Sequence, residues 1–160
     1  MRRKDKEIKD QGAILDIINK TKYITVAMCA DNEPYLVTLN HGYDKVNKCL
    51  YFHCAKEGKK IGVLQKNNKV WGQALIDKGY VAGTCDHLYA SVHFSGRVTF
   101  IEDFNEKRTA LVTMIEALEK EPEEVIRKQL TRESVQNVRI GRIDIEKMFG
   151  KISEKAVISL

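Results

Sequence analysis

The chain has 160 residues, of which 43% are hydrophobic and 31% charged, a composition typical of a globular protein with one well-buried core. No apolar run approaches the roughly 20 residues that span a bilayer, and the charged first seven residues lack the apolar stretch of a secretory signal. We therefore expect a cytoplasmic protein with one domain over residues 1–160 and no membrane partner.

The net charge of +5 and the pI near 9.0 favour an anionic partner, such as a phosphorylated small molecule or a nucleic acid. Basic and acidic residues are interleaved along most of the chain, and basic residues do not alternate with aromatic ones as in a base-stacking surface. We expect a small-molecule ligand and no nucleic acid. The four cysteines lack metal-ligand spacing, which predicts reduced thiols and no metal site.

The predicted elements begin with an amphipathic helix over residues 4–19, after which the pattern changes to short strands. Strands are predicted over residues 23–29, 35–40, 49–54, 70–76, 89–102 and 138–145, and residues 77–88 are expected to form a loop. Gly96 interrupts its strand and marks a bend.

Two helices are predicted in the second half of the chain. Asp103 and Glu106 have the spacing of a capping box, and Pro122 is well placed to open a further helix that ends near Leu130. Six strands with few helices and no parallel crossover pattern predict a mainly β fold, a small antiparallel barrel decorated by helices.

The segment with the clearest chemical pattern is residues 50–61, a strand that runs through His53 into Gly58, Lys59 and Lys60 before an apparent helix. Free backbone N–H groups at a helix start, a glycine and two lysines favour a phosphate. An ordinary basic helix start fits the same residues. His53 is a candidate ligand contact or acid–base group, and a plain strand histidine is the alternative.

Polar side chains on two other strands are weaker candidates. Thr38 and Asn40 are polar side chains on one side of a strand whose backbone groups can meet a planar ligand, and Ser91 is a candidate contact to a phosphate. A plain barrel strand explains Ser91 equally well. His41, His87 and His93 form no readable triad with a serine or cysteine.

Several segments, taken in order, resemble the FMN-binding split-barrel family (pyridoxamine phosphate oxidase-like), especially its nitroimidazole-resistance branch. They are RRKD at 2–5, PYLVTLN at 34–40, YFHCA at 51–55 with GKK at 58–60, YASV at 89–92 with Gly96, and IDI at 143–145 before GK at 150–151. The sequence contains no motif for pyridoxal phosphate recognition.

The resemblance implies a six-stranded antiparallel split β-barrel with an N-terminal helix and helices in its C-terminal half. It implies a homodimer with FMN at the subunit interface and His53 beside the flavin or substrate, as the candidate catalytic residue. The implied cofactor-binding residues are Thr38, Leu39 and Asn40 along the isoalloxazine ring, Gly58, Lys59, Lys60 and Ser91 near the phosphate, and His53, Cys54 and Ala55 in the adjoining strand end.

The favoured function is an oxidoreductase that passes electrons from reduced flavin to a small acceptor such as a nitroaromatic compound. Two alternatives stay open. One is a flavin carrier or sensor without turnover, and the other is a haem-binding split-barrel protein with one of the four histidines as axial ligand.

Overall fold

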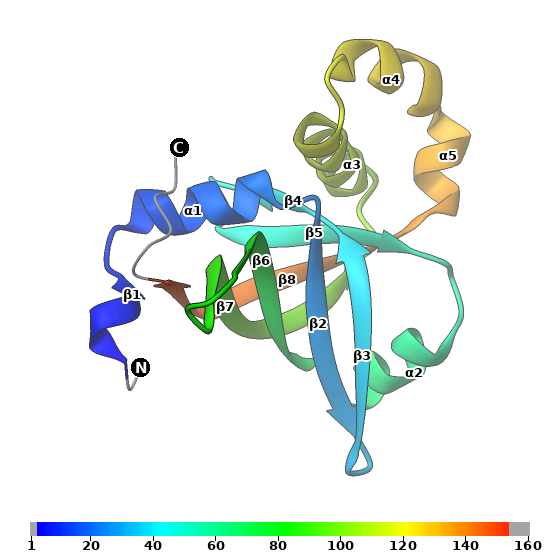
Figure 1. Cartoon of the computed structure of the whole chain (residues 1–160). Coiled ribbons are helices and arrows are strands. Elements are labelled where there is room, and N and C mark those ends of the chain that lie inside the picture. Colours follow the sequence, from blue (N-terminus) through cyan, green and yellow to red (C-terminus); the bar gives the residue numbers. More distant parts are fainter. Residues whose placement is uncertain (1–2, 154–160) are drawn as a thin grey trace.

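The structure is a computed structural model, and it describes residues 3–153. One antiparallel sheet of eight strands, in the order β3-β2-β6-β7-β8-β5-β4 with β1 paired to β8, forms the body of the protein (Figure 1). The strands are β1 Glu7–Ile8, β2 Tyr23–Ala30, β3 Glu33–Asn40, β4 Gly42–Asp44, β5 Cys49–Cys54, β6 Lys69–Val81, β7 Asp86–Ile101 and β8 Arg139–Ile152. The helices are α1 Gln11–Lys20, α2 Lys59–Lys66, α3 Phe104–Leu118, α4 Pro122–Gln129 and α5 Arg132–Asn137, after a short 3₁₀ turn at Lys4–Lys6.

The sheet curls until its two sides approach each other. β3 stands at one edge and β5 next to the other edge, yet the two strands are in contact without being paired. This is a split barrel, and the mainly β fold class is confirmed. The six predicted strands are β2, β3, β5, β6, β7 and β8, while β1 and β4 are short additions that the sequence pattern did not predict.

Alternating side chains fill the interior of the barrel, as the period of two residues in a strand requires. Ile24, Val26 and Met28 of β2 point inward, and Phe52 and Phe94 from β5 and β7 are almost fully buried beside them. Burying one such large side chain contributes about 1.5 to 3 kcal/mol. A second, smaller cluster lies between β5 and α3, so the two faces of β5 are both covered.

The first helix starts later than predicted. Asp10 caps α1 by accepting a hydrogen bond of 2.8 Å from the Ala13 amide, and the helix begins at Gln11. Residues before this cap are extended, and Glu7–Ile8 pairs with the end of β8. The expectation of a helix from residue 4 is therefore wrong, because the Asp10 side chain caps the N-terminus of the helix and sets its start at Gln11.

The helices of the second half begin where their capping residues predict. Asp103 accepts a 2.8 Å hydrogen bond from the Glu106 amide, and Pro122 is the first residue of α4. The short α5 was not predicted, and it begins at Arg132, after the capping residue Thr131, whose hydroxyl accepts a hydrogen bond from the Ser134 amide. Figure 1 shows these three helices together, far from the turn that joins β2 to β3.

Residues 77–88, expected as a loop, extend the β6–β7 hairpin. Pairing continues from Gly79 with Leu88 to Val81 with Asp86, after a bulge that follows Asp77. The Asp77 carboxylate accepts a 2.7 Å bond from the Gly79 amide, and Gly79 has a φ of 92°. The glycine and the bulge interrupt the alternation of residues on which the strand prediction depends, so the sequence pattern did not predict this part of the hairpin.

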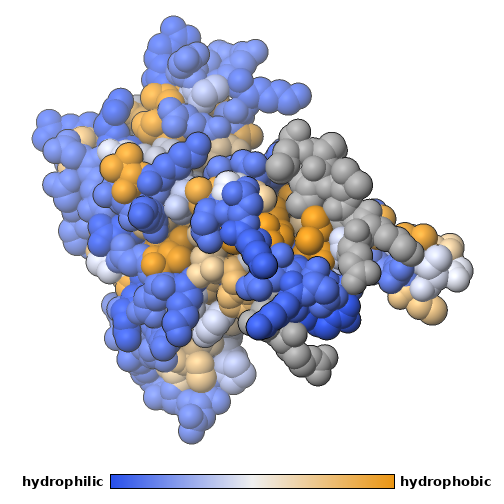
Figure 2. All heavy atoms as spheres, turned by 90° about the vertical axis from the view of Figure 1, so that its left-hand side faces the viewer, coloured by the Kyte–Doolittle hydropathy of each residue, from blue (hydrophilic) through white to orange (hydrophobic). Residues whose placement is uncertain are grey.

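The outer surface carries mixed charge. Figure 2 shows hydrophilic side chains around scattered apolar ones on the face seen from the left of Figure 1. No helix within residues 3–153 is both long and apolar enough to cross a membrane.

Candidate functional site

The turn between β5 and α2 is open, as phosphate binding needs. Gly58 is the residue before the first turn of α2, with a φ of 141°, and no atom lies within 4 Å of the position of a Cβ there. No side chain caps this helix. The first backbone N–H groups of α2 have no partner within the helix, so this end offers hydrogen-bond donors to an anion.

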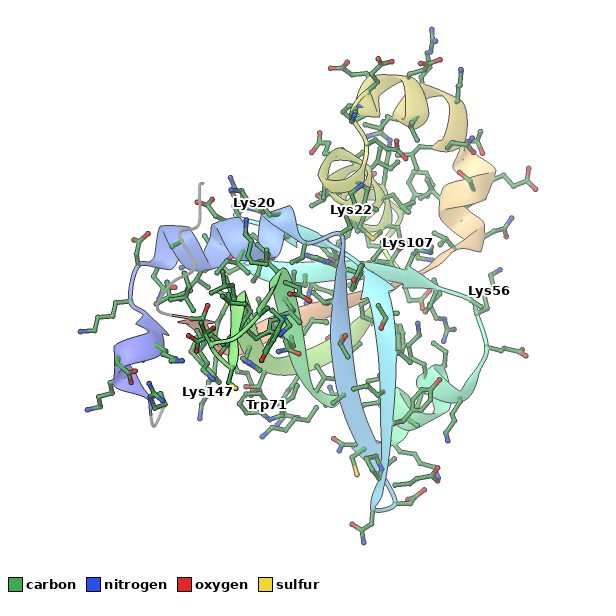
Figure 3. All side chains as sticks on the ribbon, viewed as in Figure 1. Lys20, Lys22, Lys56, Trp71, Lys107 and Lys147 are labelled. Carbon is green, nitrogen blue, oxygen red and sulfur yellow. The ribbon has the colours of Figure 1, made fainter. Side chains whose placement is uncertain are left out.

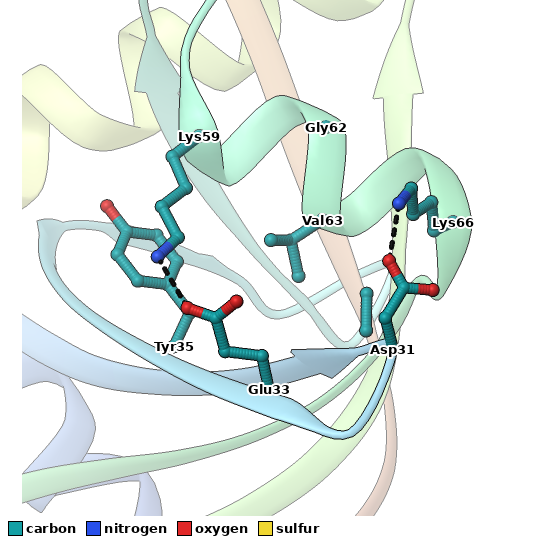
Figure 4. A pocket seen from close by; sticks show the side chains of 8 residues that line it. Asp31, Glu33, Tyr35, Lys59, Gly62, Val63 and Lys66 are labelled. Atoms are coloured by element: carbon teal, nitrogen blue, oxygen red, sulfur yellow. Dashed lines mark hydrogen bonds and ion pairs between the residues drawn. The ribbon is translucent and has the colours of Figure 1, made fainter.

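Lys59 is occupied by a neighbouring strand. Its Nζ lies 3.0 Å from the Glu33 carboxylate and 4.9 Å from the ring centre of Tyr35, so β3 holds this side chain (Figure 4). Two helical turns further on, Lys66 pairs with Asp31, and the two ion pairs fasten the tip of the β2–β3 hairpin to α2. A pocket of about 240 Å³ lies between these pairs.

Lys60 points toward the barrel instead. Its Nζ lies 5.4 Å from the ring centre of Phe52, and its charge acts on the Cys54 thiol. Burial raises the pKa of Cys54, while the positive charges of Lys60 and Arg139 oppose that rise. Cys54 is therefore a neutral thiol beside two cations, and it lies next to the open turn.

His53 and Cys54 point to opposite faces of β5. Phe52 and Cys54 belong to the barrel side, whereas His53 shares the other face with Tyr51 and is itself exposed. His53 stands opposite Ile140 of β8. Ala55 follows the strand end and is exposed. The candidate acid–base group thus lies near the turn but outside the barrel interior.

The predicted ring-binding residues occupy the end of β3. Leu39 points into the core, and Thr38 and Asn40 share the outer face of the strand, as predicted. The Asn40 amide donates a 2.8 Å bond to the Lys22 carbonyl, which fixes this end of β3 to β2. Thr38 and the strand's outer backbone groups stay available for a planar ligand.

Ser91 is not brought to the Gly58 turn within one chain. It lies in β7 between Leu75 and Lys151 and faces the outer side of the sheet. Further along β7, the Val98 amide donates a hydrogen bond to the Asn68 carbonyl, just after the end of α2. Seven residues of strand separate Ser91 from Val98, which is about 23 Å.

Around Ser91 the outer face of the sheet is hollowed by about 400 Å³. The residues that line this hollow are Gln73, Leu75, Asp77, His87, Tyr89, Ser91, His93 and Lys151. His93 stacks on Phe149 at 5.4 Å between ring centres, and burial together with Lys151 lowers the pKa of His93. His87 lies 2.7 Å from the Asp77 carboxylate.

The other titratable candidates are structural. His41 is buried, its Nε2 lies 3.1 Å from the Ile18 carbonyl oxygen, and burial lowers its pKa. All four cysteines are unpaired, as predicted. Across the described part of the chain, no three His, Cys, Asp or Glu side chains are grouped so as to hold a metal ion.

Two features of the site were not predicted from the sequence. Arg139 stands opposite Cys54 in the β5–β8 ladder, although 85 residues separate the two in the chain. Trp71, Phe149 and His93 form an aromatic row on the outer face of β6, β7 and β8. Alternation along single strands indicated which faces these residues occupy, but only the pairing of distant strands brings them together.

The curled sheet, the contact between β3 and β5 and the open turn before α2 define a split-barrel protein. The sequence matches the profile of the pyridoxamine 5'-phosphate oxidase family over residues 10–152, and the chain belongs to that family. No curated protein matches the sequence.

Solved structures share the fold over nearly the whole chain. A candidate 5-nitroimidazole antibiotic resistance protein from Bacteroides thetaiotaomicron is 31% identical, with a TM-score of 0.78 over 91% of this chain and 86% of that one. The flavocytochrome Anf3 from Azotobacter vinelandii is 17% identical, with a TM-score of 0.80 over 96% and 72% of the two chains. The FAD and heme binding protein from Mycobacterium smegmatis is 16% identical, with a TM-score of 0.77 over 93% and 74%.

Proposed function

We propose that this chain is a flavoprotein that binds FMN at the β5–α2 turn and the outer face of β3, and that it works as a homodimer. The observation that carries the proposal is the pairing of an open helix start at Gly58 with Lys60, which points from that turn toward the barrel. A phosphate monoester carries close to two negative charges at neutral pH, and this donor set suits it.

The candidate site matches FMN in length as well as in charge. Thr38 lies five residues along β3 from Glu33, the partner of Lys59, a span of about 17 Å that a ring and a ribityl phosphate can follow. In the proposed arrangement Lys59, Lys60, Gly58 and the end of β5 at Cys54 and Ala55 receive the phosphate. The outer backbone of Thr38, Leu39 and Asn40 then lies along the ring.

We further propose that the protein is an oxidoreductase for a small acceptor such as a nitroaromatic compound. When bound, flavin supplies electron transfer to the acceptor, and the protein supplies position and charge. His53, exposed at the end of β5, is placed to contact an acceptor beside the cofactor. The printed name of the 31% identical Bacteroides protein, which refers to 5-nitroimidazole resistance, supports this acceptor class.

The homodimer gives Ser91 a role that one chain does not. Exposed apolar side chains lie on the same outer sheet face as the hollow around Ser91, which favours cover by a second copy. In the proposed dimer, Ser91 of one protomer meets the cofactor of its partner. The four free thiols support a cytoplasmic location.

Haem binding is a second candidate function, because two of the structural neighbours are named for haem as well as flavin. His87 and His93 both line the 400 Å³ hollow, and His93 also stacks on the ring of Phe149. The flavin proposal is preferred because the Gly58 turn suits a phosphate, which haem does not carry.

The visible absorption spectrum of the purified protein, before and after addition of FMN and dialysis, tests the proposal. Retained flavin bands at about one per chain support it, and a Soret band favours haem. Anaerobic turnover with a reduced nicotinamide donor and a nitroimidazole then separates a reductase from a carrier. Bound flavin without turnover would favour a flavin carrier over a reductase.

A further inference from the structure

A buried serine forms the floor of the hollow on the outer face of β6, β7 and β8. Ser91 is 2% exposed, and the register places it between Leu75 of β6 and Lys151 of β8. Tyr89 and His93, which precede and follow it on the same face of β7, line the hollow on either side. The volume of about 400 Å³ is within the range of small-molecule sites.

The hydroxyl of Ser91 has no partner in the described part of the chain. Among residues 3–153 it makes no hydrogen bond, although the residue is almost fully buried. Buried polar groups in folded proteins are normally hydrogen-bonded, because an unpaired group loses hydration without compensation. Ser91 lines the hollow, so a molecule bound there can supply the partner that the strands do not.

Lys151 brings a positive charge to the same floor. Its Nζ lies 5.3 Å from the ring centre of Tyr89, and no carboxylate oxygen of residues 3–153 lies within 4.0 Å of it. Burial and, after it, the charge of Lys151 lower the pKa of His93, so the charge acts inside the hollow. His93 is therefore a neutral ring at neutral pH.

The carboxylate among the lining residues is engaged by its own hairpin. Asp77 lies opposite Tyr89, its Oδ1 is 2.7 Å from Nε2 of His87, and it accepts a 2.7 Å hydrogen bond from the Gly79 amide. These hydrogen bonds lower the pKa of Asp77. Within residues 3–153, Lys151 is thus a cation of the hollow without an acidic partner.

We infer that this hollow binds a small planar molecule through a carboxylate group, which Lys151 and Ser91 hold. A carboxylate carries one charge and only accepts hydrogen bonds, which matches one ammonium group and one hydroxyl donor. A phosphate monoester carries nearly two charges and would need a second cation. The rings of Tyr89 and His93 beside the floor suit a planar ligand.

For the proposed flavoprotein, the inference names a class of acceptor. In the proposed homodimer the hollow faces the partner's cofactor, so an aromatic nitro acid bound in the hollow lies beside the flavin. This step rests on the proposed function, whereas binding of the carboxylate itself does not.

Isothermal titration of the full chain with para-nitrobenzoate and with para-nitrobenzamide tests the inference, because the two probes share their shape and differ in charge. The variants are Lys151→Met, which keeps the stem over Tyr89, Lys151→Arg, which keeps the charge, and Ser91→Ala. Lys147→Met and Ser95→Ala are the matched controls. Lys147 and Ser95 lie opposite each other on β8 and β7, on the same sheet face but outside the hollow.

The wild-type chain is expected to bind para-nitrobenzoate at least about tenfold more tightly than the amide. Lys151→Met should remove this preference and leave amide binding within about twofold, and Lys151→Arg should keep the preference. Ser91→Ala should weaken para-nitrobenzoate binding about fivefold, and the two controls should change neither constant by more than about twofold. Thermal unfolding without ligand checks that each variant is folded.

Three outcomes would overturn the inference, whether or not the protein retains FMN: equal wild-type affinity for the two probes, no binding of either, or an equal loss from Lys147→Met and Lys151→Met. If para-nitrobenzoate binds as expected and no flavin is retained, the carboxylate site stands and the proposed flavoprotein fails. With flavin retained, a kcat/KM no higher for the acid than for the amide would contradict the hollow as the acceptor site.

Discussion

Gly141 of β8 is a residue whose missing side chain makes room for a core ring. A Cβ at this position would lie 2.2 Å from Cζ of Phe52, which is almost fully buried. We predict that Gly141→Ala lowers the free energy of unfolding by about 1 to 3 kcal/mol, because the ring must leave its packed position. Urea denaturation measures this change.

Gly62 of α2 provides the matched control for Gly141. No atom lies within 4 Å of its Cβ position, and an alanine in a helix is favoured over glycine. Gly62→Ala is expected to raise the free energy of unfolding by up to about 1 kcal/mol. A loss from Gly62→Ala equal to that from Gly141→Ala would contradict the contact with Phe52 as the cause.

Cys49 gives a prediction of pH dependence. This residue is fully buried opposite Asp144, and burial is the main cause that raises the pKa of its thiol from 9.0 to about 11. A pKa raised by folding stabilises the folded state below the unfolded pKa, and this contribution is lost as the pH rises toward the folded pKa. The pH window is therefore about 9 to 11.

Over that window, the wild-type free energy of unfolding should fall relative to Cys49→Ala by up to about 2.7 kcal/mol, at 1.36 kcal/mol per pKa unit. The loss of packing in Cys49→Ala lowers the free energy of unfolding by an amount that does not change with pH. Urea denaturation of both proteins at several pH values isolates the thiol, since all other groups titrate in both. Parallel pH curves for the two proteins would contradict the buried, protonated thiol.

At the scale of elements, local chemistry in the sequence was enough to place most strands and helices. The bounds of β5 were predicted to the residue, because Cys49–Cys54 is a compact apolar run between polar turns. Asp103 and Pro122 fixed two helix starts through a side-chain bond and a preset backbone angle. Each of these signals lies within a few residues of the feature that it sets.

Features that depend on pairing between distant segments were missed. The two residues of β1 are a strand only because Gly150 leaves room for Ile8 beside it, and a Cβ on that glycine would lie 2.9 Å from the Cβ of Ile8. The same holds for the candidate site. Lys60 was predicted from its own turn, whereas Arg139 joins it through the β5–β8 register, which no local pattern encodes.

At the scale of the whole molecule, exposed apolar side chains within residues 3–153 lie on the outer side of β3, β2 and β6. The register aligns Leu36, Ala27 and Trp71 in one row, with Leu36 61% and Trp71 47% exposed. Trp71 projects from the sheet near Lys147 in Figure 3. Exposed apolar surface of this kind on a single chain marks an interaction site, and the proposed homodimer accounts for it.

Placing charge on this row should separate the proposed dimer into single chains. We predict that Leu36→Glu combined with Trp71→Glu reduces the mass in solution from twice 18.3 kDa to 18.3 kDa, because a two-fold contact buries each new carboxylate in both copies. Sedimentation equilibrium measures the mass, and circular dichroism checks that the variant is folded.

Val46→Glu is the control, since Val46 is 90% exposed in the turn between β4 and β5, off this face. A wild-type mass of one chain, or equal dissociation by Val46→Glu, would show that this face is not the dimer contact, and the route by which Ser91 reaches a partner's cofactor would be lost with it.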